Sequence, residues 1–330
     1  MPDEIEFRTK PQIALEQIDR ALANGIRVSA WTFDEFYGRV HAFLDGLEAR
    51  RQAFVGEIPC NFHGWVQKPT VLRTGPKTTK KGGRKKRYPR LARRRPTCEV
   101  GNLLKYSPVF CEQPWRRYRI KDTDHGPEVW EVKWAVFWWK GGAGLPTRRH
   151  CLIVARNVLT GEVKYFLSNQ VPGEYHPVTG HYVTLQWLLR VAFGRWSIES
   201  CFRQGKEELG LDHYEVRGWR CVHRHFFVTQ LSHLFCARVR QEYDTAPSDQ
   251  VDRLTVEQVR SAMNAWLDSA DLSPKYRRQR LEHELAKQHY YQARNKQART
   301  SHTKTRRSRL SALGIDADRI ESCLDRKDRQ

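Results

Sequence analysis

The segment from residue 11 to residue 34 constrains the fold most, because it predicts a helix, a turn and a strand that ends in a carboxylate. Pro11 opens "PQIALEQIDRALAN", whose apolar residues recur at helical spacing, and Asn24-Gly25 is a typical helix end. The next stretch, "IRVSAWTF", alternates mostly as a strand does and leads directly into Asp34. We therefore expect an α/β fold with Asp34 at the carboxyl end of a strand, where such folds collect functional groups.

The remaining chain alternates between helical, basic and strand-rich stretches. "EFYGRVHAFLDGLEARR" predicts a helix and "AFVGEI" a short strand. "EVWEVKWAVFWW", "HCLIVARNV" and "VKYFLSN" predict strands, with "LTGE" as a hairpin turn, and helices resume at "TLQWLLRVAF". Five regions are expected: a core region at 1–67, a basic flexible loop at 68–113, a β-rich insertion at 114–175, a helical part of the core at 176–241 and a helical basic C-terminal region at 242–330.

Charge indicates the kind of partner. Lysine and arginine number 58 against 37 aspartate and glutamate residues, which gives a formal net charge of +21. So many positive side chains repel one another and destabilise a compact state unless a polyanion neutralises them. Nucleic acid is therefore the expected partner. In the basic loop we expect Lys85, Lys86 and Arg87 to contact phosphates. Charge alone leaves open a solvated cationic surface or a ribosome-associated, RNA-binding protein.

Cysteine spacing and hydropathy argue against several other classes of protein. The eight cysteines form no CxxC pair, so neither a disulfide framework nor a zinc ribbon is indicated. "CVHRH", with Cys221, His223 and His225, lacks a second ligand pair at a recognisable spacing. The apolar runs are too short to span a membrane. We expect reduced thiols in an intracellular protein.

The stretch "RWSIESCFRQGKEELGL" places a carboxylate close to two cations on a predicted helix. Glu199 lies one turn after Arg195, and Lys206 falls within about 20° of Glu199 on the same helical face. We expect Ile198, Phe202 and Leu209 to anchor this side of the helix to a core. A solvated salt-bridged helix would explain these charges alone. Together with Asp34, however, the pattern favours carboxylates that hold divalent metals for phosphodiester cleavage.

"RWSIESCFRQGKEELGLDHYEVRGW" resembles the signature of DDE-type transposases of bacterial insertion sequences, whose third catalytic acid lies in a Tyr-Arg-Glu-Lys pattern. Arg195, Glu199 and Lys206 match the last three positions, while the tyrosine position falls on Ala192. "TFDEFYGRVHAFLDGL" resembles the segment around the family's second catalytic Asp, which corresponds to Asp34. "EVKYFLSN" and "YYQARNKQARTSH" also resemble the family, so the resemblance extends over nearly the whole chain.

The resemblance implies a partial RNase H-like core with a β-rich insertion between the second and third acids. It implies two Mg2+ or Mn2+ ions, with Asp34 and Glu199 as metal ligands and catalytic residues, and with Arg195, Arg203 and Lys206 on DNA phosphates. The implied chemistry is water attack at transposon ends, then attack by the freed 3′ hydroxyl on target DNA. The implied partner is double-stranded DNA, bound by a homodimer in the bacterial cytoplasm at the nucleoid.

The first of the family's three acids has no convincing counterpart. Upstream of Asp34 the chain offers Asp3, in a terminus without a predicted strand, and Asp19, in the middle of a predicted helix. We therefore expect an amino-terminally truncated transposase, or the downstream frame of one, that binds DNA but does not cut it alone. Three other interpretations stay open: an inactive DNA-binding remnant, an RNA-binding basic protein, and a metal-dependent nuclease of another kind.

Overall fold

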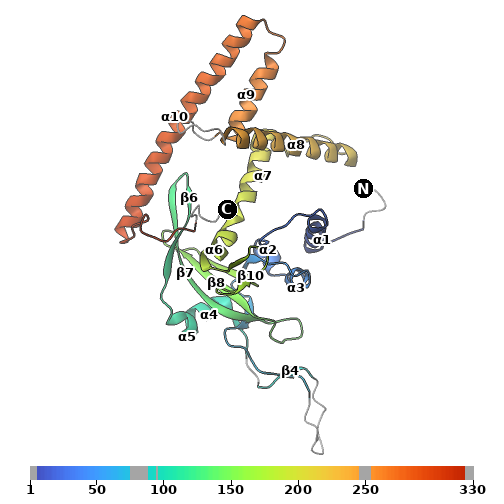
Figure 1. Ribbon diagram of the computed structural model, residues 1–330, viewed down its shortest axis with the longest axis vertical. Helices are drawn as coiled ribbons and strands as arrows, with labels where there is room; N and C mark the ends of the chain where they lie inside the picture. The colour runs from blue at the N-terminus through green and yellow to red at the C-terminus, as the bar shows by residue number, and fades with distance from the viewer. Residues whose placement is uncertain (1–5, 75–87, 94–95, 245–253, 324–330) are drawn as a thin grey trace, which may run out of the picture. The chain divides into compact units, whose positions relative to one another are not determined.

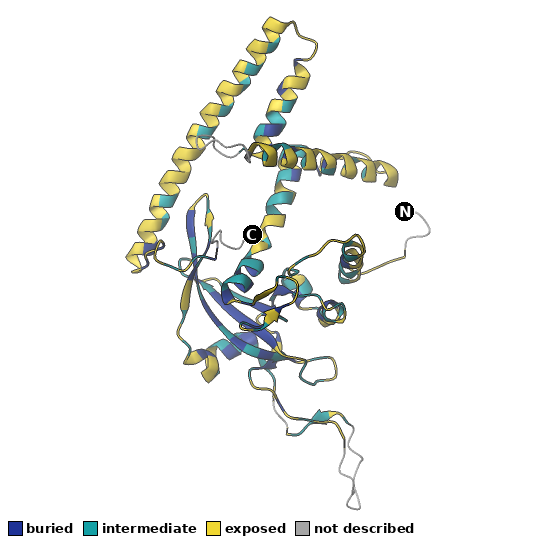
Figure 2. Ribbon diagram, viewed as in Figure 1, coloured by how far each residue is buried: buried dark blue, intermediate teal, exposed yellow. Residues whose placement is uncertain are grey.

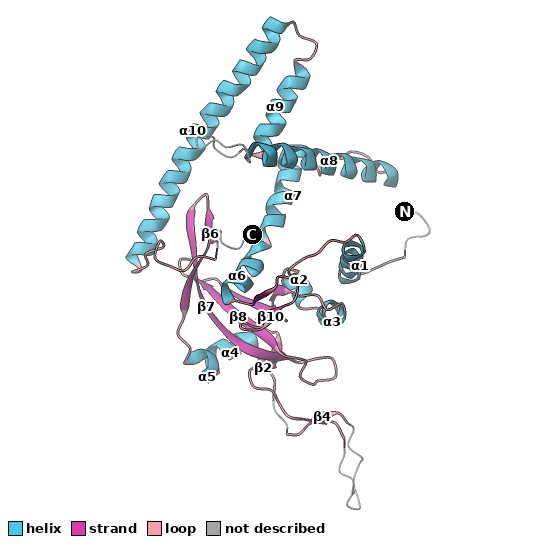
Figure 3. Cartoon of the chain, in the orientation of Figure 1, coloured by secondary structure: helices cyan, strands magenta, loops and turns pink. Residues whose placement is uncertain are grey.

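The computed structural model describes residues 6–74, 88–93, 96–244 and 254–323, which belong to two compact units (Figure 1). The sheet unit comprises Glu6–Arg195 and Thr303–Gln330, and the helical unit comprises Met1–Ile5 and Trp196–His302. Figure 3 shows the strands, in magenta, in the sheet unit. The boundary between the units falls directly after Arg195, inside the stretch that resembles the transposase signature.

The first helix forms where the sequence predicts it. Helix α1 spans Lys10–Ala23, has a proline in its first turn and ends with Asn24 as its C-cap. The backbone N–H of Thr9 donates to Gln12 Oε1 at 2.8 Å and so satisfies one donor at the helix start. Gly25 has a φ of 75°, the left-handed conformation that glycine adopts easily after a helix. The predicted start and end of this helix are confirmed.

The helix predicted after Asp34 is divided in two. Helix α2 spans Glu35–Gly38 and helix α3 spans His41–Ala49, with Val40 extended between them as the N-cap of α3. The prediction of one continuous helix was wrong. The helix is interrupted where Val40 is extended, with φ −93° and ψ 99°. Just before this break α2 packs closely on the sheet, since a Cβ atom added at Gly38 would lie 1.9 Å from the carbonyl oxygen of Glu57.

Seven strands form one sheet, and all of their recorded pairings are antiparallel. The order is β1 (Val55–Ile58), β9 (Val163–Ser168), β8 (His150–Asn157), β7 (Gly126–Trp139), β2 (His63–Trp65) and β5 (Cys98–Glu99), with β6 (Arg116–Thr123) also paired to β7. Two short hairpins lie outside it, β3 (Val71–Leu72) with β4 (Arg90–Leu91) and β10 (Tyr175–His176) with β11 (His181–Tyr182). The predicted β-rich region and strand β1 therefore share a sheet.

The turn between β8 and β9 is the predicted hairpin turn. Asn157 Oδ1 accepts hydrogen bonds from the backbone N–H groups of Leu159, at 2.9 Å, and Thr160, at 3.1 Å. Gly161 has a φ of 72°, which glycine tolerates and which the tight connection requires. The "LTGE" prediction is confirmed, and the asparagine before it closes the turn.

Both faces of the sheet are buried, and the alternation of side chains along β8 shows this directly. Leu152 and Val154 belong to the cluster on one face, whereas Cys151, Ile153 and Ala155 belong to the cluster on the other. The sequence of a strand that is buried on both sides is typically a continuous run of apolar residues, as "CLIVA" is. The central sheet is therefore a layer between two apolar cores.

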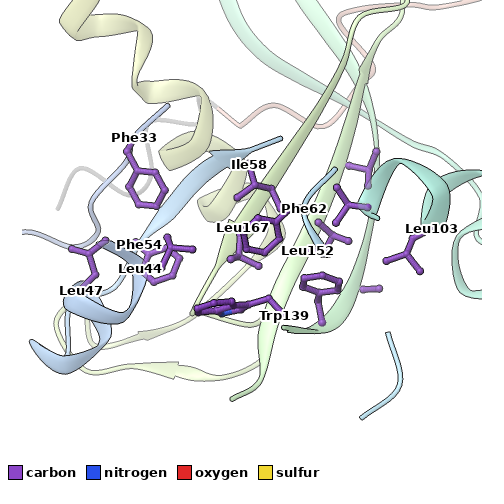
Figure 4. Packing of buried hydrophobic residues seen from close by; sticks show 14 of the residues in the cluster. Phe33, Leu44, Leu47, Phe54, Ile58, Phe62, Leu103, Trp139, Leu152 and Leu167 are labelled. Atoms are coloured by element: carbon purple, nitrogen blue, oxygen red, sulfur yellow. The ribbon is translucent and has the colours of Figure 1, made fainter. Parts of the chain in front are cut away.

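Helices pack on both faces of the sheet. Figure 4 shows the first cluster, in which Leu44 and Leu47 of α3 and the sheet residue Trp139 are fully buried. Helices α4 (Val100–Tyr106) and α5 (Pro108–Cys111) add buried apolar residues to this face. Helix α6 (Leu185–Gly194) covers the second face through Leu188 and Leu189. The sheet that carries β1 is thus fixed from both sides.

The last described residues complete the sheet unit. Helix α10 spans Pro274–Ala312, and the chain after it runs along β6. The backbone N–H of Arg119 donates to the Glu321 carbonyl at 3.0 Å, and that of Cys323 donates to the Arg119 carbonyl at 3.0 Å. Cys323 is fully buried in the second cluster. Residues 303–323 therefore stabilise the sheet, although the sequence places them in a basic tail.

The helical unit contains α7 (Trp196–Leu209), α8 (Trp219–Asp244), α9 (Val256–Asp268) and α10 up to His302. Its buried apolar cluster is small, and Figure 2 shows α8 mostly exposed. Five large apolar residues of α8 are each at least 47% exposed: Phe226, Phe227, Leu231, Leu234 and Phe235. Within the described ranges no helix, α8 included, has the length and apolar content needed to cross a membrane.

A half-buried carboxylate joins α3 to β8. Glu48 Oε1 lies 2.7 Å from Nε2 of His150, whose side chain is fully buried, and 2.8 Å from Nε of Arg148. Burial by itself raises the pKa of the Glu48 carboxyl, but the hydrogen bond and charge of His150, and then those of Arg148, outweigh it and lower the pKa. Ionised Glu48 is therefore part of the packing between helix and sheet.

Replacing this carboxylate should change how stability depends on pH. A lowered folded-state pKa means that Glu48 stabilises the fold above its ordinary value of 4.5, and that this contribution is lost as pH falls through the folded pKa. We expect Glu48→Gln to lower the free energy of unfolding by about 1 to 3 kcal/mol at pH 7. The difference from wild type should shrink below pH 4.5 in urea titrations. The exposed Glu162→Gln is the control, and a difference independent of pH would contradict the account.

The contact between α2 and β1 gives a second test. We expect Gly38→Ala to lower the free energy of unfolding by about 1 to 3 kcal/mol, because the added methyl group meets the Glu57 carbonyl. Gly194→Ala is the matched control, since an added Cβ there has no atom within 4 Å. It should be neutral or slightly stabilising in a helix. Equal stability of the two variants in thermal unfolding would refute the close approach.

Candidate active site

Asp34 lies at the end of a short extended segment beside β1. The Trp31 N–H donates to the Ala53 carbonyl at 2.8 Å, and the Val55 N–H donates to the Trp31 carbonyl at 2.9 Å. The Glu57 N–H then donates to the Phe33 carbonyl at 3.0 Å, and the bridge between these segments is parallel. The pairing covers residues 31–33, a shorter stretch than predicted. The prediction of a strand over residues 26–33 was wrong, because only an isolated bridge at Trp31 forms, but Asp34 does follow the extended segment that pairs beside β1.

The side chain of Asp34 also has a local structural role. It is the N-cap of α2, and its Oδ1 accepts a hydrogen bond from the backbone N–H of Tyr37 at 3.3 Å. The residue is half-buried. One carboxylate oxygen is thus directed at the helix start, which fixes the side chain. Capping alone accounts for an aspartate here, so capping and metal binding must be separated by experiment.

Glu199 lies in the first turn of α7 in the helical unit and is half-buried. The predicted anchors around it differ in burial. Leu209 packs against the small apolar cluster of this unit, but Ile198 is 48% and Phe202 50% exposed. Helix α7 contacts α8 and α9, and Gly205 is its buried residue. The prediction that Ile198 and Phe202 lie in a core was wrong.

The cations expected near these acids are distributed over the chain. Arg203 and Lys206 lie on α7 and are exposed, whereas Arg195 is the half-buried C-cap of α6 in the sheet unit. Ala192, at the position of the family's tyrosine, is buried against the sheet. Three further predicted phosphate contacts lie outside the described residues: Lys85, Lys86 and Arg87.

The two candidate metal ligands belong to different compact units, Asp34 to the sheet unit and Glu199 to the helical unit. Among the described residues, no group of three or more His, Cys, Asp or Glu side chains is arranged to hold a metal ion. The chemistry of the two donors nevertheless suits Mg2+, which prefers carboxylate oxygens. Each unit thus offers one suitable ligand, and neither offers a complete site within the described ranges.

Asp19 forms an ion pair with Arg50. It lies on α1, and both of its carboxylate oxygens accept hydrogen bonds from the Arg50 guanidinium at 2.6 Å. These hydrogen bonds lower the pKa of Asp19. The pair joins α1 to the end of α3 and gives Asp19 a structural role.

Sequence reasoning missed a polar cavity in the helical unit. It has a volume of about 460 Å3, and carboxamide and cationic side chains contribute much of its wall. The available signal was the spacing of Gln288, Gln292, Asn295, Lys296 and Arg299, which recur on one face of a predicted helix. The sequence analysis assigns these residues to the basic C-terminal region at 242–330.

Comparison with known proteins points to one enzyme superfamily. A family model described as DDE superfamily endonuclease matches residues 1–127. No curated protein matches the chain. The matched range includes Asp34 and the segments that position it, α2 and β1, whereas Glu199 lies outside it. Over residues 1–127 the chain is similar to DDE superfamily endonucleases.

Proposed function

We propose that this chain is a DDE-type DNA transposase protein that acts at transposon ends and target DNA, with Asp34 and Glu199 as two of its metal ligands. One observation carries the proposal: Asp34 lies at the carboxyl end of a segment paired in parallel with β1, inside the range matched by the endonuclease family. The net charge of +21 supports a polyanionic substrate. Nucleic acid is the substrate class that the endonuclease family implies.

The proposed architecture is a partial RNase H-like core. A sheet covered on both faces by helices, with a parallel segment at the edge beside Asp34, supports this assignment. Residues 1–67 and 176–241 are assigned to the core and 114–175 to an elaboration of the same sheet. Two protomers acting on two DNA ends, as the resemblance implies, remain part of the proposal.

In this proposal, one set of residues binds the metal ions that cleave a phosphodiester bond, and another set binds the DNA phosphates. Divalent ions activate the attacking oxygen and stabilise the leaving oxygen when bound. Asp34 and Glu199 would hold these ions. Arg195, Arg203 and Lys206 would hold phosphates of the bound strand, because guanidinium and ammonium groups donate strong hydrogen bonds to phosphate oxygens. The basic residues Lys85, Lys86 and Arg87 would add further phosphate contacts.

The family's chemistry requires a third carboxylate. The pairing of Asp19 with Arg50 supports the proposal that Asp19 does not serve as that ligand. We therefore expect these 330 residues by themselves to bind DNA and not to cut it. Supercoiled plasmid incubated with Mg2+ should stay intact with wild type as with Asp34→Asn. Nicking by wild type that the variant lacks would refute the expected inactivity.

Two substitutions at position 34 separate capping from metal binding. Asn is as good an N-cap as Asp, so Asp34→Asn should leave stability nearly unchanged, whereas Asp34→Ala should cost about 1 kcal/mol. Both substitutions remove the charged ligand. Both should therefore abolish any gain in DNA affinity that Mn2+ gives over EDTA, and so should Glu199→Gln. A variant Asp34→Asn that keeps this gain would show that Asp34 only caps α2.

The assigned phosphate contacts predict a characteristic salt dependence. Lys206→Ala should weaken duplex binding and lower the slope of log affinity against log salt concentration by about one unit, because one fewer counterion is released. Lys105→Ala, an exposed lysine on α4 without an assigned role, should leave the slope unchanged. Fluorescence anisotropy across a salt series measures both. Tighter binding to duplex RNA than to duplex DNA would favour the RNA-binding interpretation instead.

A further inference from the structure

We propose that residues 280–297 of α10 form a binding surface for double-stranded DNA, and that this part of the helix enters the major groove. Six side chains define the surface, which we call the α10 stripe: Arg280, His283, Lys287, Tyr290, Arg294 and Gln297. All six belong to the helical unit, so the surface depends on that unit alone. That the bound polyanion is DNA rests on the proposed function.

The α10 stripe follows one side of the helix. Its members are separated by three or four residues in turn, so at 100° per residue they lie within about 100° of one another around the axis. At a rise of 1.5 Å per residue the stripe extends for about 26 Å. Apolar residues at this spacing would predict a coiled coil, but none of the six is aliphatic. The stripe is therefore a continuous polar surface.

This side of α10 is accessible. All six stripe residues are exposed, and Figure 2 shows most of α10 exposed along its length. Within 280–297, a range that the structure describes in full, no residue is fully buried. The half-buried residues of this range lie on the other side of the helix: Leu281, Glu284, Gln288 and Gln292. The helix thus packs through that other side and leaves the stripe uncovered.

Most of the stripe has no hydrogen-bonding partner within the described part of the chain. Four of its residues have no recorded hydrogen bond or ion pair with another described residue: Arg280, His283, Arg294 and Gln297. Lys287 Nζ lies 3.9 Å from Glu284 Oε2, and such a pair with an exposed lysine contributes little. A solvated salt-bridged helix would instead pair its cations one turn away, as Arg278 pairs with Glu282 at 2.8 Å. Salt bridges along the helix therefore do not account for the stripe.

The charge around the stripe favours a polyanionic ligand. Residues 285–315 contain eight lysine or arginine residues and no aspartate or glutamate. Such a run of like charges repels itself, and no acid within it offsets the repulsion. A nucleic acid supplies phosphates along its whole length, and each phosphate that a cation neutralises releases a counterion. The stripe therefore suits a nucleic acid better than a small anion.

Size and chemistry favour the major groove of B-form DNA. A helix with its side chains is about 10 to 12 Å across, and this groove is about 12 Å wide, whereas the minor groove is about 6 Å wide. In the major groove arginine and lysine contact guanine, and glutamine contacts adenine. Arg294 and Gln297 lie one turn apart on the stripe and so can contact neighbouring base pairs. The major groove of duplex RNA is deep and narrow, which disfavours RNA.

Two fluorescein-labelled DNA duplexes of one sequence test the proposal. One has ordinary cytosines, and in the other each cytosine carries a glucosylated 5-hydroxymethyl group. The glucose is uncharged and fills the major groove, so it obstructs a helix there and leaves the phosphates unchanged. In fluorescence anisotropy with EDTA, wild type should bind the modified duplex at least about fivefold more weakly, the loss of one good base-edge contact. Arg294→Ala should bind the ordinary duplex at least about fivefold more weakly than wild type and should show a smaller difference between the duplexes.

Arg278→Ala is the matched control. Arg278 is exposed on the same helix, about 160° around the axis from Arg294, so its variant should keep the wild-type affinity and the full difference between the duplexes. Circular dichroism should show equal helix content in all variants. Equal affinity of wild type for both duplexes, or equal affinity of Arg294→Ala and Arg278→Ala for the ordinary duplex, would overturn the proposal. Tighter binding to duplex RNA of the same sequence would overturn the assignment to the DNA major groove.

Failure of this proposal is distinguishable from failure of the proposed function, because the assay needs neither metal nor cleavage. If Arg294→Ala binds DNA as wild type does, while the gain in affinity from Mn2+ still requires Asp34, the α10 stripe is not the DNA surface and the proposed function stands. If instead the stripe results hold and Asp34→Asn keeps the gain from Mn2+, the proposed metal site fails and the α10 stripe stands.

Discussion

The pairing of residues 31–33 with β1 is the interaction on which the candidate site depends. Three backbone hydrogen bonds hold this segment, and Asp34 follows it directly at the start of α2. Gly38 allows α2 to contact the backbone of β1, and the two buried faces of the sheet hold β1 in place. Backbone geometry and core packing therefore position one carboxylate before any metal or DNA contributes.

Much of this arrangement could be predicted from the sequence because its signals are local. Proline and Asn24-Gly25 mark the ends of α1, and the asparagine and glycine around residue 160 mark the β8–β9 hairpin. The continuous apolar run of β8 indicates a strand buried on both sides. The extended segment before Asp34 followed from the same kind of signal, although the alternation over residues 26–33 predicts a strand and only a bridge at Trp31 forms.

What could not be predicted depends on contacts between distant segments. The break between α2 and α3 lies at the extended Val40, next to the close contact of Gly38 with Glu57, and local propensity reveals neither. Ile198 and Phe202 are apolar at helical spacing, yet α7 packs through another face, so apolar spacing alone did not identify the buried side. Four helices line the cavity of the helical unit. The sequence indicates only the α10 part of this wall, through the helical spacing of its polar residues.

The central proposal is that Asp34 and Glu199 bind the same divalent ions when the chain is on DNA. Fe2+ supplied in place of Mg2+ tests this proposal, because a bound Fe2+ ion with ascorbate and peroxide generates radicals that cut the nearby polypeptide backbone. The account predicts cuts close to both Asp34 and Glu199, and it predicts that Asp34→Asn and Glu199→Gln each weaken both cuts. Cuts near one residue only, or cuts near each residue that respond only to its own substitution, would contradict a shared site.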